Sequence, residues 1–430
     1  MKRVIIVSPY FPPSTVAGVH RARILAKYLP ACRWEPVLFC VDERYHEQRL
    51  DPGLAALVPP STRVIKVRAW PTRFSRAIGI GDVGMRGYLS LLRAVRALIA
   101  CEGADLLLIT ALPGFPLVMG PGIKRKFGIP FIADFQDPWL PQDYRAAGPL
   151  SKMWAVHRIA VVAEPYVLRG ADHVTSVSEQ TNALIRARYP WMPPDRFSAI
   201  PIGGDEADFD FLMSQERPCP WIEVAPNRIT FAYVGNVWTR AFKTLEATFA
   251  AIAALKAQKP QLYDRLRFVF VGTSNQPVEA AAEVVMPFAR RAGIAEVVRE
   301  EPRRVPYLDA LNTLLHADAL LMFGSDEPHY TASKLYPVLL AKRPVLGIFH
   351  EKSSVCSIAE DVGGIQLVKF ARACSLGSQI PEIASAIELI AQKPQDTRRA
   401  NLGKLEPYFG PAIAGRFADI FQQVLERAVP

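Results

Sequence analysis

The sequence predicts an α/β protein built from two Rossmann-like, doubly wound domains that face each other across a cleft. Short apolar runs rich in β-branched residues alternate with helix-length segments, as in a parallel sheet that is covered by helices. This alternation stops near residue 206 and starts again near residue 229. A chain of 430 residues is also longer than one hydrophobic core normally organises.

The first half contains runs that we predict to be strands, at residues 3–7, 35–40, 63–67, 105–110, 130–135 and 173–178. Segments of helical length lie between several of these runs, at 20–30, 87–103 and 152–170. We therefore assign residues 1–205 to an N-terminal Rossmann-like domain.

Residues 206–228 mix acids and prolines without a clear period, which predicts a linker. The second half then predicts strands at 229–235, 266–272, 295–300, 317–323 and 343–349, and helices at 244–258, 277–292, 306–316 and 381–392. We assign residues 229–405 to a C-terminal Rossmann-like domain. The last helix, within 411–430, carries one apolar stripe, and we expect it to join the N-terminal domain.

The composition indicates the cellular compartment in which the protein acts. No stretch of eighteen apolar residues occurs, and the apolar run at the N-terminus is too short for the core of a signal peptide. The six cysteines show no CxxC spacing, which is typical of reduced thiols. We therefore expect a cytoplasmic protein, acting at the inner face of the membrane if it binds lipid.

Positive charge is concentrated in the first half. Residues 1–205 carry 26 Lys and Arg against 16 Asp and Glu, whereas residues 206–430 carry 25 of each. A one-sided positive field attracts anionic membrane, nucleic acid or a phosphorylated ligand, although it also serves solubility alone. Because no zinc finger, RRM, KH or basic-zipper pattern is present, we expect no nucleic-acid partner.

Two common nucleotide-binding motifs are absent. The first predicted strand is followed by "SPYFPPSTVAG" rather than by G-x-G-x-x-G, and no GxxxxGK[ST] sequence occurs. A nicotinamide dehydrogenase and a P-loop hydrolase are therefore both disfavoured.

Several segments together resemble the glycosyltransferases of family 4. They stand in the family's order along almost the whole chain: "SPYFPPSTVAGVHRARILAKYL" (8–29), "FIADFQDPW" (131–139), "ADHVTSVSEQTNALI" (171–185), "IPIGGDEADF" (200–209), "FAYVGNVWTRAFKTLEA" (231–247), "FVFVGTS" (268–274) and "ADALLMFGSDEPHYTASKLYPVLLAKRPVLGI" (317–348). The resemblance implies the GT-B fold and a nucleoside-diphosphate-sugar donor. It also implies retention of configuration and catalysis without a bound metal or other cofactor.

Three candidate residues lie in the first half. Gly18 ends the loop after the first predicted strand, where the family often has a Gly pair, and lets the backbone approach a ligand. Asp134 and Asp137 follow a buried strand, and an acidic pair before Pro-Trp resembles a subset of the family. Asp137 is our candidate for orienting or deprotonating an acceptor hydroxyl. An ordinary turn at Gly18 and a capping role for Asp137 remain open.

Four candidates follow the first predicted strand of the second half. The resemblance implies that Gly235 and Asn236 line the donor site and that Arg240 and Lys243 hold the diphosphate. Two cations would neutralise the charge that develops on the leaving group. The family's Arg commonly follows the Gly directly, where Asn236 stands here. Solvated charges at a helix start are the alternative for Arg240 and Lys243.

The stretch around Ser333 and Lys334 predicts a second anion-binding element. A hydroxyl, an ammonium and the free amides of a helix start would converge there on a diphosphate. The family's two glutamates are missing, because His329 and Pro337 occupy their positions. Glu327 and His329 are our substitutes for the first glutamate. Pro337 is tolerated in the first turn of a helix but cannot bind the ribose.

We therefore predict a retaining glycosyltransferase that acts on a saccharide or lipid-linked acceptor in surface polysaccharide or glycolipid synthesis, such as lipopolysaccharide. Hexosyl and N-acetylhexosaminyl transfer both remain open. A peripheral contact with an anionic membrane through residues 85–99 is weighed against a helix that simply covers the sheet. The alternatives are a binding or scaffold protein with a decayed site, and a sugar-nucleotide epimerase of the same fold.

Overall fold

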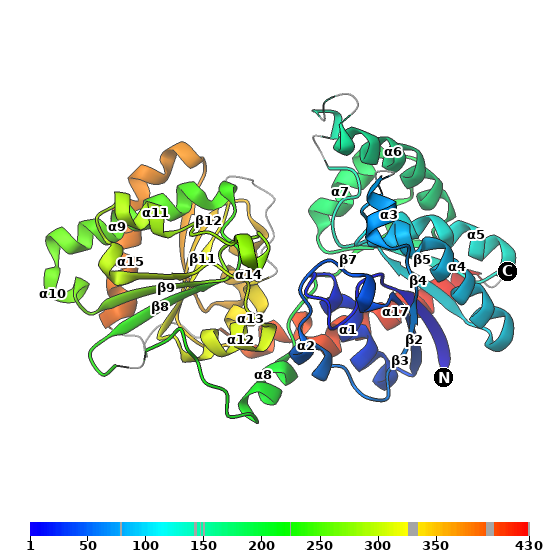
Figure 1. The fold of residues 1–430 in the computed structure, drawn as a ribbon, viewed down its shortest axis with the longest axis horizontal. Helices are drawn as coiled ribbons and strands as arrows, with labels where there is room; N and C mark the ends of the chain where they lie inside the picture. Colours follow the sequence, from blue (N-terminus) through cyan, green and yellow to red (C-terminus); the bar gives the residue numbers. More distant parts are fainter. Residues whose placement is uncertain are drawn as a thin grey trace. The chain divides into compact units, whose positions relative to one another are not determined.

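The structure is a computed structural model that describes residues 1–77, 80–141, 144–146, 148, 151–223, 225–325, 334–392 and 400–428. Contacts within the chain divide it into two compact units, each with its own parallel sheet (Figure 1). The first unit consists of Met1–Gly203 together with Gly410–Pro430, and the second is Gly204–Phe409.

Within the described residues, the first unit holds a seven-stranded parallel sheet with the order β3-β2-β1-β4-β5-β6-β7. Its strands are β1 (Lys2–Val7), β2 (Trp34–Val41), β3 (Arg63–Val67), β4 (Leu106–Thr110), β5 (Phe131–Phe135), β6 (His173–Ser176) and β7 (Phe197–Ala199). The central strands β4 and β5 are buried along their whole length, because helices cover both faces of the sheet. This explains why they read as unbroken apolar runs rather than as alternating ones.

Two groups of helices cover this sheet. Side chains of α4, α5 and α6 pack in the core on one face, and side chains of α1 and α17 pack in the core on the other. The helices of this unit are α1 (Val19–Tyr28), α2 (Pro52–Ala56), α3 (Thr72–Ala77), α4 (Val83–Glu102), α5 (Met119–Phe127), α6 (Lys152–Gly170), α7 (Glu179–Arg188) and α17 (Gly410–Ala428).

The described part of the second unit contains a six-stranded parallel sheet with the order β10-β9-β8-β11-β12-β13. Its strands are β8 (Ile229–Val234), β9 (Leu266–Val271), β10 (Val298–Glu301), β11 (Ala319–Phe323), β12 (Val345–His350) and β13 (Ile365–Phe370). Its helices are α8 (Glu206–Met213), α9 (Phe242–Gln258), α10 (Pro260–Tyr263), α11 (Met286–Arg291), α12 (Tyr307–His316), α13 (Leu335–Leu340), α14 (Ser354–Val362), α15 (Ile380–Gln392) and α16 (Leu402–Leu405). The two Rossmann-like domains predicted from the sequence are thus confirmed.

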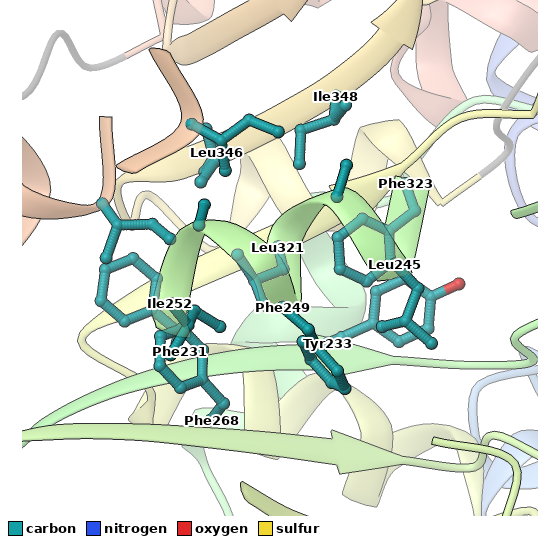
Figure 2. Close-up of a cluster of buried hydrophobic side chains, with 14 of the residues drawn as sticks. Phe231, Tyr233, Leu245, Phe249, Ile252, Phe268, Leu321, Phe323, Leu346 and Ile348 are labelled. Carbon is teal, nitrogen blue, oxygen red and sulfur yellow. The ribbon is translucent and has the colours of Figure 1, made fainter. Parts of the chain in front are cut away.

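An aromatic cluster forms the core beneath α9 (Figure 2). The ring of Phe231 stacks on that of Phe268 with centroids 5.3 Å apart, and Tyr233 stacks on Phe323 at 5.0 Å. Phe249 of α9 meets the same group from the helix side. Aromatic pairs of this kind contribute about 0.5–1.5 kcal/mol each beyond their buried area, so the ends of β8 and β11 are firmly placed.

The unit boundaries differ from the predicted domains of 1–205, 229–405 and a linker at 206–228. Residues 206–213 form α8 and belong to the second unit. The hydroxyl of Tyr307 donates to Asp208, and the amide of Asn312 donates to the carbonyl of Arg217, which fixes this segment against α12. The last helix, α17, belongs to the first unit, where Phe421 lies edge-on to Trp34.

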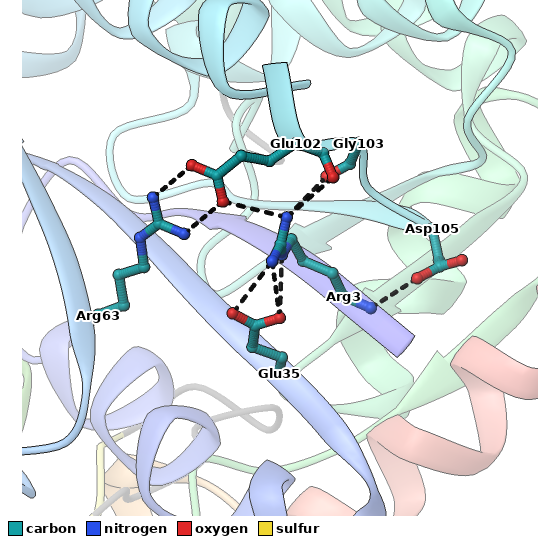
Figure 3. A network of polar contacts seen from close by, with 6 residues as sticks. All are labelled: Arg3, Glu35, Arg63, Glu102, Gly103 and Asp105. Atoms are coloured by element: carbon teal, nitrogen blue, oxygen red, sulfur yellow. Dashed lines mark hydrogen bonds and ion pairs between the residues drawn. The ribbon is translucent and has the colours of Figure 1, made fainter. Parts of the chain in front are cut away.

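Charged side chains tie the amino-terminal ends of the first three strands to the end of α4 (Figure 3). Arg3 of β1 donates to the carboxylate of Glu35 at 3.0 Å, and Arg63 pairs with Glu102 at 2.6 Å. The main-chain amide of Arg3 also donates to Asp105 at 2.6 Å. Part of the basic excess of the first half therefore serves the packing of the sheet, at the edge opposite the strands' carboxyl ends.

Candidate functional site

Each sheet has one place where the strand order reverses. In the first unit this place lies between β1 and β4, and in the second it lies between β8 and β11. Open parallel sheets bind ligands outside the carboxyl ends of the strands at such a point. The loops that follow β8 and β11 contain the donor-site residues predicted from the sequence.

The ammonium of Lys334 is held against the loop that follows β8. Its Nζ donates to the hydroxyl of Tyr233 at 3.1 Å and to the main-chain carbonyl of Asn236 at 3.2 Å, and it lies 4.8 Å from the centre of the Tyr233 ring. The Tyr233 hydroxyl itself donates to the same carbonyl at 2.9 Å. Burial raises the pKa of Tyr233, so the phenol stays protonated and can make both contacts.

Glycine is required at the centre of this contact. Gly235 has a φ of 116°, and a Cβ there would lie 2.5 Å from Nζ and 2.6 Å from Cε of Lys334. Gly272, which follows β9, has a φ of 76°, and a Cβ on it would lie 3.8 Å from the Cα of Gly235. Two glycine backbones therefore lie side by side at this edge and leave a surface without side chains beside the Lys334 ammonium.

The start of α9 brings two more cations to the same loop. Arg240 and Lys243 are both exposed, and the Arg240 guanidinium lies 5.8 Å from the centre of the Trp238 ring. The hydroxyl of Thr244 donates to the carbonyls of Ala241 and of Gly324, at 2.7 and 3.0 Å. This contact joins the first turn of α9 to the end of β11. The amide end of α9 and its cations thus lie where the strand order reverses, an arrangement that favours an anion.

Three predicted donor residues, Glu327, His329 and Ser333, lie outside the described residues. Lys334 directly precedes α13, which spans only six residues. Pro337 is the third residue of this helix, where its missing N–H would be unpaired in any case. Within the described residues, the group that this segment contributes to the candidate donor site is the Lys334 ammonium.

Gly18 closes the corresponding loop of the first unit. It precedes α1, and a Cβ on it would lie 2.7 Å from the Leu112 side chain and 2.9 Å from the Gln136 amide oxygen. The Gln136 side chain donates to the Gly18 carbonyl at 3.3 Å. Gly18 therefore permits close packing of the loops that follow β1, β4 and β5.

Asp134 differs from the prediction that it lines a ligand-binding loop. Its side chain is fully buried, with one carboxylate oxygen 3.5 Å from Nε of the equally buried Arg21 and the other accepting from the Thr175 hydroxyl at 2.8 Å. The remaining guanidinium nitrogens of Arg21 donate to the carbonyls of Ile200 and Pro201. The central position of β5 in the sheet points this side chain into the protein, so Asp134 holds β5, β6 and α1 together and does not reach solvent.

Asp137 is placed differently, two residues beyond the end of β5. Its side chain is exposed and hydrogen-bonds to none of the residues that the structure describes. Partial desolvation by the surrounding protein raises its pKa. It does not act as a turn cap within the described chain, so its carboxylate can accept a hydrogen bond from a ligand.

Sequence reasoning missed three residues at these edges. Tyr233, which holds Lys334, was signalled by a single phenol in the largely apolar run "ITFAYV". Gln136 was signalled by a polar residue directly after a buried strand. Arg304 follows β10, and its Cα lies 4.0 Å from where a Gly272 Cβ would be; its signal was the pair "RR" in "EPRRVP".

The described residues contain no group of three or more His, Cys, Asp or Glu side chains that could hold a metal ion. Metal independence stays a prediction. Among the same residues, no helix combines the length and the apolar character that crossing a bilayer requires.

Comparison with known families identifies the first unit. Residues 18–203 match the model of the glycosyl transferase 4-like domain. No curated protein matches the chain. The family match confirms the resemblance to family 4 and the prediction of a glycosyltransferase.

Solved structures share the fold over the full length. A glycosyltransferase from Rickettsia africae superposes with a TM-score of 0.64 at 14% identity, covering 99% of each chain. HepE from Anabaena, solved with UDP and glucose, gives 0.61 at 13% identity, covering 98% of this chain and 100% of that one. WaaG, a glycosyltransferase involved in lipopolysaccharide biosynthesis, gives 0.54 at 13% identity, with coverages of 99% and 98%. These likenesses confirm the GT-B type of fold.

Proposed function

We propose that this chain, whose first unit is a glycosyl transferase 4-like domain, transfers a sugar with retention from a nucleoside diphosphate to a hydroxyl acceptor. The second unit binds the donor and the first unit binds the acceptor. The observation that carries this assignment is the Lys334 ammonium fixed on Tyr233 and Asn236 where the strand order reverses.

A diphosphate fits this edge because its charge matches what the loops present. Lys334, Arg240 and Lys243 supply cations, and the start of α9 adds the positive end of a helix dipole. The glycine surface at Gly235 and Gly272 lets phosphate oxygens approach the backbone. HepE was solved with UDP-glucose bound, which supports a uridine diphosphate donor here.

The chemistry follows from where charge develops. In a front-side displacement, the bond between the anomeric carbon and the donor phosphate oxygen breaks, while the acceptor oxygen bonds to the same face of that carbon. The departing diphosphate oxygen takes the acceptor proton. Lys334, Arg240 and Lys243 stabilise the charge that grows on the diphosphate, and this stabilisation lowers the barrier without a metal. Asp137 accepts a hydrogen bond from the acceptor hydroxyl and orients it.

The setting that we propose is the synthesis of a surface polysaccharide or glycolipid on the cytoplasmic side of the membrane. A saccharide or lipid-linked acceptor suits a first half that carries the whole basic excess of the chain. Likeness to WaaG, which is involved in lipopolysaccharide biosynthesis, supports this setting.

One observation favours a second candidate, a binding protein whose catalytic site has decayed. Pro337 stands where the family places the glutamate that binds the ribose, and proline has no group that can do so. Such a protein would bind nucleotide sugars without consuming them.

A turnover assay distinguishes a glycosyltransferase from a binding protein and from an epimerase. We would incubate the chain with UDP-sugars and lipid and saccharide extracts, and measure UDP release and labelled product. The proposed function predicts acceptor-dependent UDP release that falls about 100-fold in Lys334→Met, the loss typical of one transition-state contact. Lys342→Met, an exposed lysine beyond the far end of α13, is the matched control and should leave the rate unchanged. Binding without release would favour the decayed site, and an isomerised sugar nucleotide would favour an epimerase.

A further inference from the structure

Helix α6 presents an apolar surface to solvent. Figure 1 shows this helix at the periphery of the first unit. Val162 is 75% exposed and Met153 is 56% exposed. The other exposed large apolar residues on the helix are Trp154, Val156, Ile159 and Tyr166.

Four of the exposed residues lie on one face of the helix. Ala155, Ile159, Val162 and Tyr166 recur at intervals of four, three and four residues, which places them in one stripe along the helix. The opposite side of the helix, including Ala160, Val167 and Leu168, is buried against the unit. Packing within the unit therefore explains the inner side of α6 but not the outer stripe.

Positive charge borders the stripe. Arg158 and Arg169 are exposed on α6, and their guanidinium groups lie over the rings of Trp154 and Trp191, at 5.8 and 5.2 Å. Trp191 is itself 45% exposed, so a second element contributes an aromatic ring beside the helix. The neighbouring α5 ends in a basic turn that contains Lys124, Arg125 and Lys126.

Negative charge is excluded from the exposed face of α6. The one acid in its sequence is Glu164, whose side chain is fully buried and bonded to Arg188 and to the Tyr189 hydroxyl. A solvent-exposed helix normally mixes charges of both signs on its outer face. An apolar stripe with aromatic and arginine borders and no carboxylate is typical of helices that lie in the interface of an anionic bilayer.

We propose that the outer face of α6, defined by Ala155, Ile159, Val162 and Tyr166 and bordered by Arg158 and Arg169, docks on the surface of an anionic membrane. The stripe enters the acyl boundary, and the two arginines bind lipid phosphates. A second copy of the chain fits less well. A symmetric pair would bring the same arginines together with no carboxylate on the helix to neutralise them.

The structure also decides against the helix first considered for this role. Leu91, Val95, Leu98 and Ile99 of α4 are all buried in the core. Arg86 is buried as well, and donates to the carbonyls of Trp70 and Tyr45. Helix α4 therefore covers the sheet, and α6 is the helix of this unit with an unpartnered apolar stripe among the described residues.

Vesicle binding tests the proposal without donor or acceptor, so its failure is separate from a failure of the proposed transfer. We would measure co-sedimentation of the full chain with vesicles of phosphatidylcholine alone and of phosphatidylcholine mixed equally with phosphatidylglycerol. The wild type should bind the anionic vesicles more strongly, and added salt should weaken this binding.

Two paired variants identify the surface. Ile159→Glu with Val162→Glu should lower the partition coefficient at least tenfold, because two buried apolar contacts are lost. Arg158→Gln with Arg169→Gln should lower binding to anionic vesicles about 30-fold, at roughly 1 kcal/mol per basic residue, and leave binding to neutral vesicles unchanged. The control is Met213→Glu with Leu389→Glu, two exposed apolar residues of the second unit, which should bind as the wild type does.

The replaced side chains are exposed, so all variants should retain the wild-type circular dichroism and melting temperature. Equal binding of the α6 variants and the control would overturn the proposal, as would a wild type that ignores anionic vesicles. Light scattering that shows a wild-type dimer, made monomeric by Ile159→Glu with Val162→Glu, would overturn it in favour of a second copy.

Discussion

The buried pair of Arg21 and Asp134 allows a direct test of whether Asp134 supports the fold or takes part in ligand binding. Asp134→Asn keeps the shape of the side chain and its ability to accept from the Thr175 hydroxyl, at 2.8 Å in the wild type. It removes the negative charge that faces Nε of Arg21 at 3.5 Å. The guanidinium is fully buried and then lacks the charge of Asp134.

The size of the effect follows from what remains around Arg21. Removing one member of a buried ion pair typically costs about 3–5 kcal/mol, because a charge stays buried without its counterion. Here the guanidinium still donates to the carbonyls of Ile200 and Pro201 and lies 5.0 Å from the centre of the Phe417 ring. The pair separation of 3.5 Å is also long for a strong contact. We therefore expect the lower end of the range, about 3 kcal/mol of unfolding free energy.

Urea denaturation followed by tryptophan fluorescence measures this loss. Arg21→Met leaves the Asp134 carboxylate buried without Arg21, and the double variant removes both charges. The double-mutant cycle should therefore show a coupling energy of about 1–3 kcal/mol. UDP-sugar turnover per folded molecule should be unchanged by Asp134→Asn. A variant that keeps its stability within about 0.5 kcal/mol and loses turnover would refute the structural assignment.

Two further predictions concern Gly235 and His173. Gly235→Ala, at a φ of 116°, should lower the unfolding free energy by about 1–2 kcal/mol and weaken UDP binding, because the added Cβ displaces Lys334. The control is Gly293→Ala, at a φ of 68° with no atom within 4 Å of the added Cβ. It should carry similar backbone strain and leave UDP binding intact. Unchanged UDP affinity in Gly235→Ala would separate Gly235 from the site. Burial lowers the pKa of His173 from 6.5 to about 4, so the folded protein holds this ring neutral. Its contribution to stability is fully present above pH 6.5 and is lost as the pH falls towards 4, by about 3 kcal/mol in all. His173→Gln should make the urea midpoint depend less on pH across this interval. An unaltered pH profile would show that His173 is not the responsible group.

The alternation of apolar strands with helices could be predicted because the strands are buried on both faces of the sheet. Strands such as β4 and β5 show as unbroken apolar runs, and their predicted bounds differ from the observed ones by one residue. Strands β7 and β13 were missed, since each lies at the edge of its sheet and carries exposed or half-buried residues. The linker was mispredicted because α8 is short and is fixed by contacts with α12 that are distant in sequence.

The candidate site could be predicted only as far as loops that follow strands. The Gly235 and Lys334 segments were identified separately, and their contact depends on β8 and β11 being neighbours, which no local pattern reveals. Asp134 and Asp137 looked alike in sequence. The direction of each side chain relative to the sheet separates them, because one points into the core and the other lies beyond the end of the strand.

Calorimetric titration of the full chain with UDP and with uridine tests the role of Lys334 most directly. Uridine lacks the diphosphate, so the difference between the two ligands reports on the contacts to phosphate alone. We predict that Lys334→Met weakens UDP binding at least tenfold and leaves uridine binding unchanged, while Lys342→Met alters neither. Equal UDP affinity in the wild type and Lys334→Met would contradict a diphosphate site at this edge of the second sheet.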